Sequence, residues 1–198
     1  MSAQSGIPPT AAERGKVAPA KFAHVVYRTS RFADMVRWYK TTLEARPMME
    51  NETFCFLTYD DEHHRVAIVN MPGLADRDPQ AAGVEHCAYT YACLDDLLGT
   101  YQRLKAEGIE PYWCINHGPT LSMYYRDPDG NQVELQIDIF ADNEATNEWF
   151  ARSDFETNPI GVKFDPEEII RRHAAGEPCE TLLARPVIAP SEVPAQFP

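Results

Sequence analysis

Long apolar runs are absent from this chain of 198 residues. No stretch approaches the roughly 20 consecutive apolar residues that span a bilayer, so a membrane partner is not expected. Residues 1–20 also lack the compact apolar segment of a secretion signal. Basic residues are scarce as well, because 18 Lys and Arg oppose 30 Asp and Glu. The resulting net charge of -12 disfavours nucleic acid and anionic lipid as partners.

Paired cysteine motifs are missing too. The 5 cysteines are spread along the chain without a Cys-x-x-Cys pair. Neither a disulfide framework nor a thiolate zinc site is therefore indicated, and free thiols favour a cytoplasmic protein. Hydrophobic residues make up 44% of the chain and aromatic residues 11%, which is enough for a folded core. A chain of this length predicts one main domain with appended segments.

The chain divides into an arm, a central domain and a tail. Residues 1–20 combine prolines with small and polar residues, which predicts a flexible N-terminal arm. Residues 21–140 carry the regular apolar patterns of the central domain. Residues 141–198 predict a tail that is partly helical and partly extended. We expect the tail to pack on the domain or on a partner subunit.

Two helices are predicted in the tail, at residues 144–152 and 166–174. Asp165 is a plausible N-cap for the second helix, with Pro166 at its first position. The tail is also rich in large aromatic side chains. Because a cluster of exposed rings is adhesive, we expect these residues to be buried against the domain or a partner. They are Trp149, Phe150, Phe155 and Phe164.

An internal repeat organises the central domain. Residues 21–70 and 83–138 each read as a strand, an amphipathic helix and three further strands. This βαβββ pattern predicts a four-stranded sheet that is covered by a helix on one face only. Pairing two such units encloses a cavity between their open faces. The expected fold class is therefore α+β, with two βαβββ units that form one barrel and place the chemistry in its cavity.

Two histidines fall at the same position of the repeat. His24 is the fourth residue of the segment KFAH, and His86 is the fourth residue of the segment GVEH. Each segment opens the first strand of its unit. In the last strand, 131–138, alternation puts Val133 and its apolar partners on the core face and Glu134 on the cavity face. Two neutral imidazoles and one carboxylate suit a divalent first-row metal. We therefore predict a metal site formed by His24, His86 and Glu134.

The fourth position of this site lacks a donor. Aligning residues 64–69 with residues 131–136 puts Ala67 opposite Glu134. A site closed by four protein ligands is therefore disfavoured. The open side can instead receive two oxygens of a substrate together with dioxygen, which is the layout of the non-haem iron(II) oxygenases.

These residues are similar to those of the vicinal oxygen chelate superfamily, and within it to the type I extradiol dioxygenases, which cleave catechols beside the diol. The similarity covers about residues 20–140 and includes HHRVAI at 63–68 and SMYYRDPDGNQVE at 122–134. It implies a single-barrel member that holds Fe(II), with Mn(II) as the other candidate metal. It also implies O2 as co-substrate, a small-molecule catechol as substrate, and a homo-oligomer, dimeric or larger.

The resemblance also implies roles for residues around the metal. In the family the run at 122–134 carries a substrate-facing tyrosine, a turn and the carboxylate ligand. This maps the tyrosine to Tyr124, which would be catalytic and hydrogen-bond the deprotonated catechol oxygen. The turn maps to Pro128 and Gly130. A second, looser match implies that His117 contacts the substrate.

An acid/base histidine is implied within the His-His-x-x-Ala segment. By this match it is His64, which would handle protons after dioxygen binds. In an ideal strand, however, His63 shares the face of Ala67 and His64 points the other way. A turn at the strand entry would rotate His64 inward. The choice between His63 and His64 therefore stays open at this point.

The implied function is Fe(II)-dependent extradiol cleavage of a catechol by O2 to a muconic semialdehyde-type product. Two alternatives remain. The first is a metal-dependent transferase or epimerase of the same fold, whose anionic substrate would require more basic cavity residues than Arg65 and Arg126. The second is a module that binds an aromatic ligand without catalysis. A measurement of metal content distinguishes the binding module from the two metal-dependent enzymes. The number of basic residues in the cavity distinguishes the transferase or epimerase from the dioxygenase.

Overall fold

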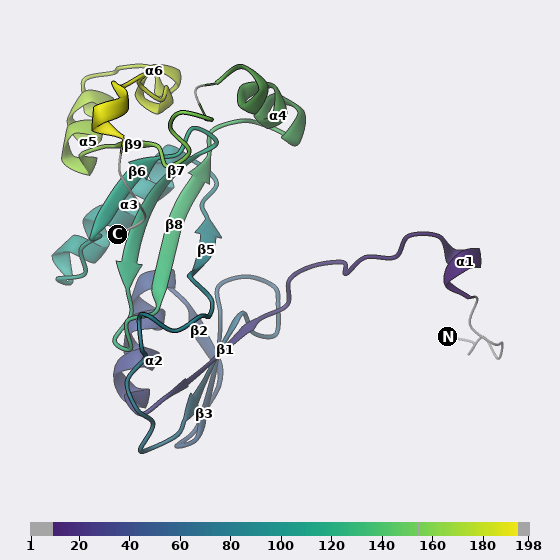
Figure 1. The fold of residues 1–198 in the computed structure, drawn as a ribbon. Coiled ribbons are helices and arrows are strands. Elements are labelled where there is room, and N and C mark those ends of the chain that lie inside the picture. Colours follow the sequence, from purple (N-terminus) through teal and green to yellow (C-terminus); the bar gives the residue numbers. More distant parts are fainter. Residues whose placement is uncertain (1–9, 154, 194–198) are drawn as a thin grey trace.

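The computed structural model describes residues 10–153 and 155–193 and confirms the α+β class with its internal repeat (Figure 1). Each unit runs strand, helix, strand, strand, strand. The first unit contains β1 (Val25–Thr29), α2 (Phe32–Leu43), β2 (Arg46–Glu50), β3 (Phe54–Thr58) and β4 (Val66–Asn70). The second unit contains β5 (His86–Thr90), α3 (Leu94–Ala106), β6 (Trp113–Asn116), β7 (Thr120–Arg126) and β8 (Gln132–Asp138).

Each unit forms its own sheet. The first sheet has the order β1-β4-β3-β2, and the second has the order β5-β8-β7-β6-β9, where β9 (Val162–Lys163) comes from the tail. In both sheets the first strand of the unit pairs in parallel with its last strand, and the other pairings are antiparallel. Among the described residues no strand pairing joins the two sheets. Strands β1 and β5 are therefore both edge strands.

Helices α2 and α3 cover the sheets on the side away from the N-terminal arm (Figure 1). Their apolar faces follow the predicted helical spacing: Met35 and Tyr39 of α2 and Leu104 of α3 are fully buried. Side chains from both helices and both sheets form one continuous core. The helices also touch directly, because the Arg103 guanidinium donates to the backbone oxygen of Thr41. Neither α2 nor α3 lies on the opposite faces of the two sheets (Figure 1).

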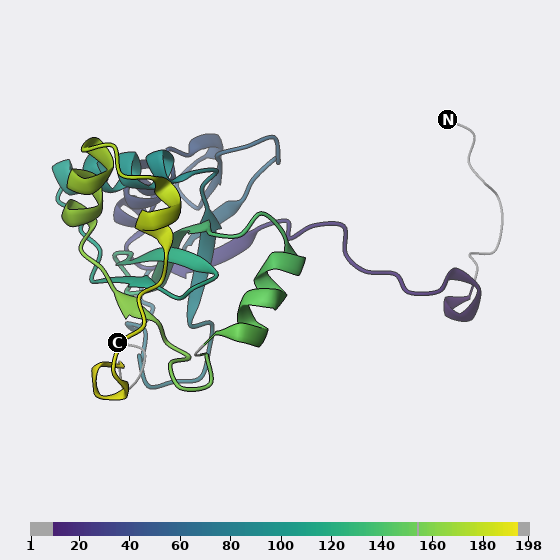
Figure 2. The same cartoon turned by 90° about the horizontal axis from the view of Figure 1, so that it is seen from above.

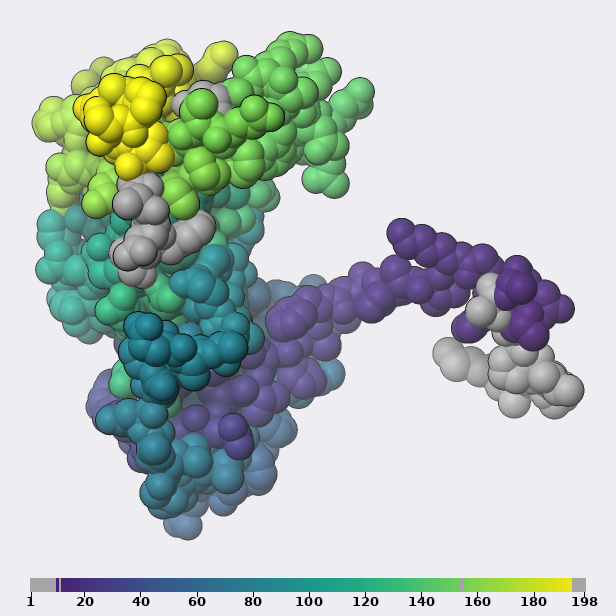
Figure 3. Space-filling view, in the orientation of Figure 1, coloured from purple at the N-terminus to yellow at the C-terminus, as the bar shows by residue number. Residues whose placement is uncertain are grey.

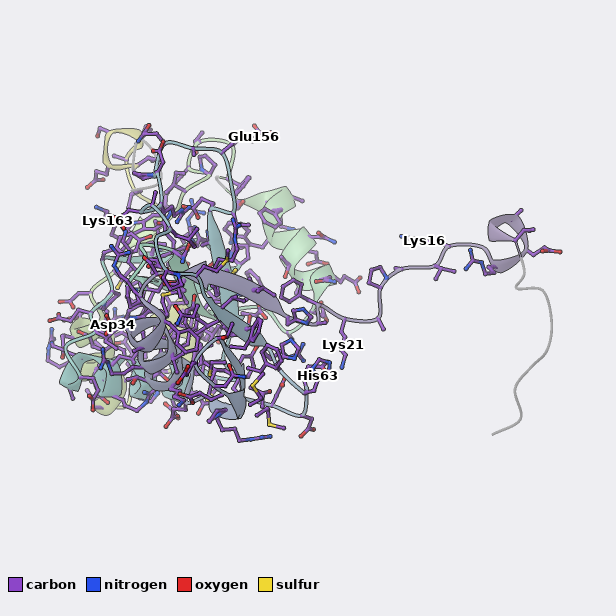
Figure 4. The ribbon with its side chains drawn as sticks, turned by 90° about the horizontal axis from the view of Figure 1, so that it is seen from below. Lys16, Lys21, Asp34, His63, Glu156 and Lys163 are labelled. Carbon is purple, nitrogen blue, oxygen red and sulfur yellow. The ribbon has the colours of Figure 1, made fainter. Side chains whose placement is uncertain are left out.

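The N-terminal arm leaves the body of the protein. Residues 10–24 contain only the short helix α1 (Ala11–Arg14), and the residues of this segment whose exposure is described are exposed. Figures 1 and 2 show the arm projecting far from both sheets, with Lys16 well out along it in Figure 4. Phe22, near the base of the arm, is 74% exposed. The arm therefore leaves a large aromatic ring in solvent when a single chain is considered.

The tail lies against the second unit. It forms α4 (Asn143–Arg152), β9, α5 (Pro166–Ala174), α6 (Cys179–Leu183) and a 3-10 helix at Pro190–Glu192. The two predicted helices are confirmed, as is the N-cap, since the Asp165 carboxylate accepts from the Glu167 backbone N–H at 3.0 Å. Strand β9 and helix α6 were not predicted. Every helix in the described part of the chain is too short or too polar to cross a membrane.

The tail aromatics differ in how far they are buried. Phe164 packs against the main core. Trp149 is half-buried and lies in a cluster with Phe140, Phe150 and Phe155. Phe150 and Phe155 remain 41% and 37% exposed, and no residue of α4, which carries Phe150, is fully buried. A single chain therefore does not supply the burial that the sequence led us to expect for these two rings.

The predicted turn between β7 and β8 is built on one buried carboxylate. Asp127 is 5% exposed and accepts hydrogen bonds from the backbone N–H groups of Asp129 at 3.0 Å and Asn131 at 2.8 Å. Gly130 takes the left-handed conformation of the turn at φ 79°. The Tyr39 hydroxyl, from α2, donates to the same carboxylate at 3.1 Å. Asp127 therefore links the two units as well as shaping the turn.

We predict that Asp127→Ala lowers the free energy of unfolding by about 2 to 3 kcal/mol, because it leaves the buried Tyr39 hydroxyl and the turn amides without an acceptor. Urea unfolding followed by circular dichroism measures this loss. The control is Asp129→Ala, which removes a more accessible ion pair with Arg31 (2.9 Å). The control should lose less than about 1 kcal/mol. Equal losses in the two variants would contradict the structural role of Asp127.

Candidate functional site

The strand register of the second sheet places its polar residues on one face. A row across β5, β8 and β7 consists of Ala88, Glu134 and Tyr124. His86 lies two residues before Ala88 on β5 and therefore points to the same side as Glu134. This is the face opposite α3, because the alternate residues Val133 and Leu135 pack in the core.

The first sheet repeats this arrangement with different residues. Its matching row across β1, β4 and β3 consists of Val26, Ala67 and Phe56. His24 lies two residues before Val26, as His86 lies two residues before Ala88. The register therefore confirms that His24 and His86 are equivalent in the repeat. It also confirms that Ala67 occupies the position that Glu134 has in the second unit.

His86 and Glu134 are in direct contact. Nε2 of His86 lies 2.9 Å from Oε2 of Glu134, whose side chain is only 6% exposed. The His86 ring packs edge-on against Tyr124, with 5.3 Å between the ring centroids. Nδ1 of His86 contacts Glu85. An imidazole nitrogen and a carboxylate oxygen thus meet at a spacing that one cation could bridge.

Tyr124 extends this group toward the tail. Its hydroxyl lies 3.0 Å from Nε2 of His117, and Nδ1 of His117 lies 2.5 Å from the backbone oxygen of Ile160. Burial raises the pKa of Tyr124, and the negative charge of Glu134 raises it further. Burial lowers the pKa of His117. The phenol therefore keeps its proton and the imidazole stays neutral near pH 7.

His24 lies in a different cluster, on the first sheet. Its ring is 4.3 Å from the ring of His64, which in turn stacks on Phe56 at 4.7 Å. His63 is farther from His24, at 6.5 Å, and its side chain is 68% exposed at the edge of the body (Figure 4). Residues 61–64 precede β4 in a bend, so strand alternation does not dictate the direction of His64. The bend turns His64 toward the face that carries Phe56.

The predicted metal ligands are not assembled by one chain. His86 and Glu134 meet on the second sheet, whereas His24 contacts His63 and His64 on the first. Across residues 10–153 and 155–193, no three His, Cys, Asp or Glu side chains come together in a way that could hold a metal ion. Each sheet thus carries part of the predicted set, and the metal-binding role of the three residues stays a prediction.

Two contributors to the site were missed from the sequence. Trp113 is 6% exposed and packs on Tyr124 at 4.8 Å and edge-on to His117 at 5.7 Å. Its position directly opposite Tyr124 in the β6–β7 pair is the signal that could have revealed it. Ile160 acts through its backbone oxygen, which no side-chain pattern reports.

The fold and the matched donor positions define a protein of paired βαβββ units with candidate metal ligands on their uncovered faces. Residues 21–135 match the sequence profile of the Glyoxalase/Bleomycin resistance protein/Dioxygenase superfamily. The chain belongs to this superfamily.

Two curated relatives from Rhodococcus globerulus extend along most of the chain. Biphenyl-2,3-diol 1,2-dioxygenase 2 is 48% identical over 166 residues, which cover 83% of this chain and 87% of the relative. Biphenyl-2,3-diol 1,2-dioxygenase 3 is 42% identical over 167 residues, which cover 83% and 88%. This similarity places the chain with the dioxygenases of the superfamily.

Among solved structures, a glyoxylase/bleomycin resistance protein/dioxygenase domain from Frankia sp. EAN1pec is similar in fold. It superimposes with a TM-score of 0.52 at 17% identity and covers 61% of this chain and 99% of that chain. At this identity the match supports the fold alone. The family profile, which spans residues 21–135, leaves out the arm and the tail.

Proposed function

We propose that this protein is an Fe(II)-dependent extradiol dioxygenase, which opens a catechol ring beside the diol with O2 and forms a muconic semialdehyde-type product. The observation that carries the proposal is the contact between His86 and Glu134 on an uncovered sheet face, with His24 at the equivalent register position of the other sheet. The 48% identity to a biphenyl-2,3-diol 1,2-dioxygenase supports the reaction and a catechol as the substrate class.

The chemistry of the donor set fits Fe(II). Two imidazole nitrogens and one carboxylate oxygen hold a first-row metal while leaving positions open, and Mn(II) accepts the same set. Ala67 offers no fourth ligand, so the open side is preserved. When bound, Fe(II) would supply a redox-active centre through which electrons pass from the catechol to O2.

Residues of the second sheet would bind and orient the substrate. Tyr124 keeps its proton because burial and Glu134 raise its pKa, and its hydroxyl oxygen can accept a hydrogen bond from a catechol hydroxyl. His117, 3.0 Å from that hydroxyl, sets its direction. Trp113 packs against both rings and keeps water from their inner side.

His64, beside the first sheet, would act as the general acid/base that transfers protons during the reaction. The pKa of His64 is lowered by burial and by the neighbouring imidazoles of His24 and His63, so the ring is neutral near pH 7. Its Nδ1 lies 2.6 Å from Nδ1 of His63, which leaves Nε2 to accept a proton and return it. A neutral imidazole within reach of the substrate is the usual general acid/base.

We also propose that the protein is a homo-oligomer in which two copies complete each site. Within one chain His24 does not meet the pair formed by His86 and Glu134. On the uncovered face that carries His24, Val26 and Phe54 are 51% and 37% exposed. Figure 3 shows an open space between the tail at the top and the projecting arm. A second copy seated there would cover this apolar face and bring its own His86 and Glu134 to His24.

The other proposed partners are a small catechol and O2. The net charge of -12 gives no support to a nucleic-acid partner. The cytoplasmic location stays a prediction, which the free thiols of all five cysteines support.

We predict that the full-length protein, reconstituted without oxygen, retains about one Fe(II) per chain and then consumes O2 with catechol or biphenyl-2,3-diol. His24→Ala, His86→Ala and Glu134→Ala should each lose both properties, because each removes one ligand. Metal analysis measures the retained iron, and oxygen uptake and the yellow colour of the product measure the reaction. His173→Ala is the control, since this tail histidine faces Asp95 at 3.1 Å.

Unchanged iron content in all three ligand variants would overturn the metal assignment. Metal binding without oxygen uptake would favour a transferase or epimerase. Catechol binding by wild-type protein that holds no metal would favour a non-catalytic binding module.

A separate prediction distinguishes the adjacent histidines. His64→Ala should retain iron and lose roughly two to four orders of magnitude in kcat, the usual range for acid/base catalysis. His63→Ala should change kcat little, because its side chain is 68% exposed and lies farther from His24. Steady-state oxygen uptake of the iron-loaded variants measures both effects. If His63→Ala proved the more damaging change, the proton-transfer role would belong to His63.

A further inference from the structure

The tail is tied to the hairpin that carries His117. Strand β9 pairs with β6 on one side of the hairpin. Arg185 makes two further links, since its Nη1 donates to the backbone oxygen of His117 at 2.9 Å and its Nη2 donates to that of Asn158 at 2.8 Å. The Arg185 guanidinium also lies over the Trp149 ring, 5.4 Å from its centroid. One side chain therefore connects the hairpin to two separate segments of the tail.

The segment 158–161 is held rigidly against this hairpin. Asn158 is 1% exposed and forms two hydrogen bonds with Gly161, donating to its carbonyl at 3.1 Å and accepting from its N–H at 2.8 Å. Gly161 has φ +122°, and a Cβ there would lie 2.4 Å from the backbone oxygen of Asn116. A side chain at this position would therefore push the tail away from β6.

This segment determines which nitrogen of His117 carries the proton. The backbone oxygen of Ile160 can only accept a hydrogen bond, so Nδ1 of His117, at 2.5 Å, must be the donor. A neutral imidazole has one N–H, which leaves Nε2 as an acceptor. The Tyr124 hydroxyl, at 3.0 Å, is the group that donates to it. The lowered pKa of the buried His117 agrees with a neutral ring.

The acceptor of the hydrogen bond that the Tyr124 hydroxyl donates determines which lone pairs of the site stay free. The hydroxyl has a single proton and two neighbours that can accept it, Nε2 of His117 and the carboxylate of Glu134. A proton given to His117 is not available to Glu134. The carboxylate then keeps its lone pairs for a cation, and the phenol oxygen can accept a hydrogen bond from a substrate hydroxyl.

We propose that the tail is a positioning device for the site: the backbone oxygen of Ile160, held by Arg185 and the Asn158–Gly161 pair, fixes His117 as its Nδ1–H tautomer and turns the Tyr124 hydroxyl away from Glu134. Arg185 is the positioning residue that substitution can test. The kinetic consequence rests on the proposed function. The tautomer is a property of the protein without metal or substrate, so it is measured independently.

The experiment compares wild type, Arg185→Met and Arg172→Met in the full-length protein. Arg172 is a matched control in the same tail, where it pairs with Glu177 at 2.7 Å. In metal-free protein labelled with 15N-histidine, long-range 1H–15N spectra report which ring nitrogen is protonated, and His117→Gln assigns the signals. Wild type and Arg172→Met should show the Nδ1–H form. Arg185→Met should show a mixture that includes the Nε2–H form.

The kinetic arm uses the iron-loaded proteins. Arg185→Met should raise KM for catechol by roughly fivefold to tenfold, the value of one hydrogen bond, with a smaller change in kcat and the same iron content. Arg185→Lys, which keeps a donor, should recover part of the loss. Arg172→Met should match wild type.

A wild-type His117 in the Nε2–H form would overturn the proposal whether or not any variant folds. The Nδ1–H form persisting in a folded Arg185→Met protein with unchanged KM would also overturn it. A tautomer change in Arg185→Met, with no turnover of catechol even by wild type, would uphold the positioning device and refute the proposed function.

Discussion

The parallel pairing of β5 with β8 is the constraint on which the candidate site depends. It sets Ala88 opposite Glu134, and His86 therefore projects from the same face with Nε2 2.9 Å from the carboxylate. A slip of one residue would turn Glu134 into the core beneath α3. The same pairing of β1 with β4 orients His24, but Ala67 stands where a carboxylate would be. One repeated topology thus places unequal sets of polar residues on the two sheets, which are the two parts of the candidate site.

Much of this arrangement could be predicted because it depends on short-range periodicity. Side chains alternate along strands and recur at helical spacing on one helix face, so the sequence indicates both units and the facing of Glu134. The equivalence of His24 and His86 follows from their places in the repeat, and the register confirms it. The turn built on Asp127 was predictable for the same local reason, since the Asp-Pro-Asp-Gly sequence specifies it.

The features of the fold and of the candidate site that the sequence did not predict depend on long-range contacts, which no local sequence pattern encodes. Strand β9 has two residues and owes its conformation to β6, and Ile160 acts through a backbone oxygen. His64 lies in a bend before β4, outside the reach of strand alternation. The separation of His24 from His86 follows from how the two sheets are held by the shared core under α2 and α3. The tail adds a further long-range element, because it fixes the hairpin next to Tyr124.

A metal site completed by two copies is tested most directly with mixed oligomers. His24→Ala and Glu134→Ala proteins with different affinity tags are co-expressed, and the hetero-oligomer is isolated by both tags. If a dimer shares its sites, one site carries both defects and the other carries none, so the hetero-dimer should recover about half of the wild-type iron content and oxygen uptake. The two homo-oligomers should remain inactive. A hetero-oligomer as inactive as its parents would contradict the shared site.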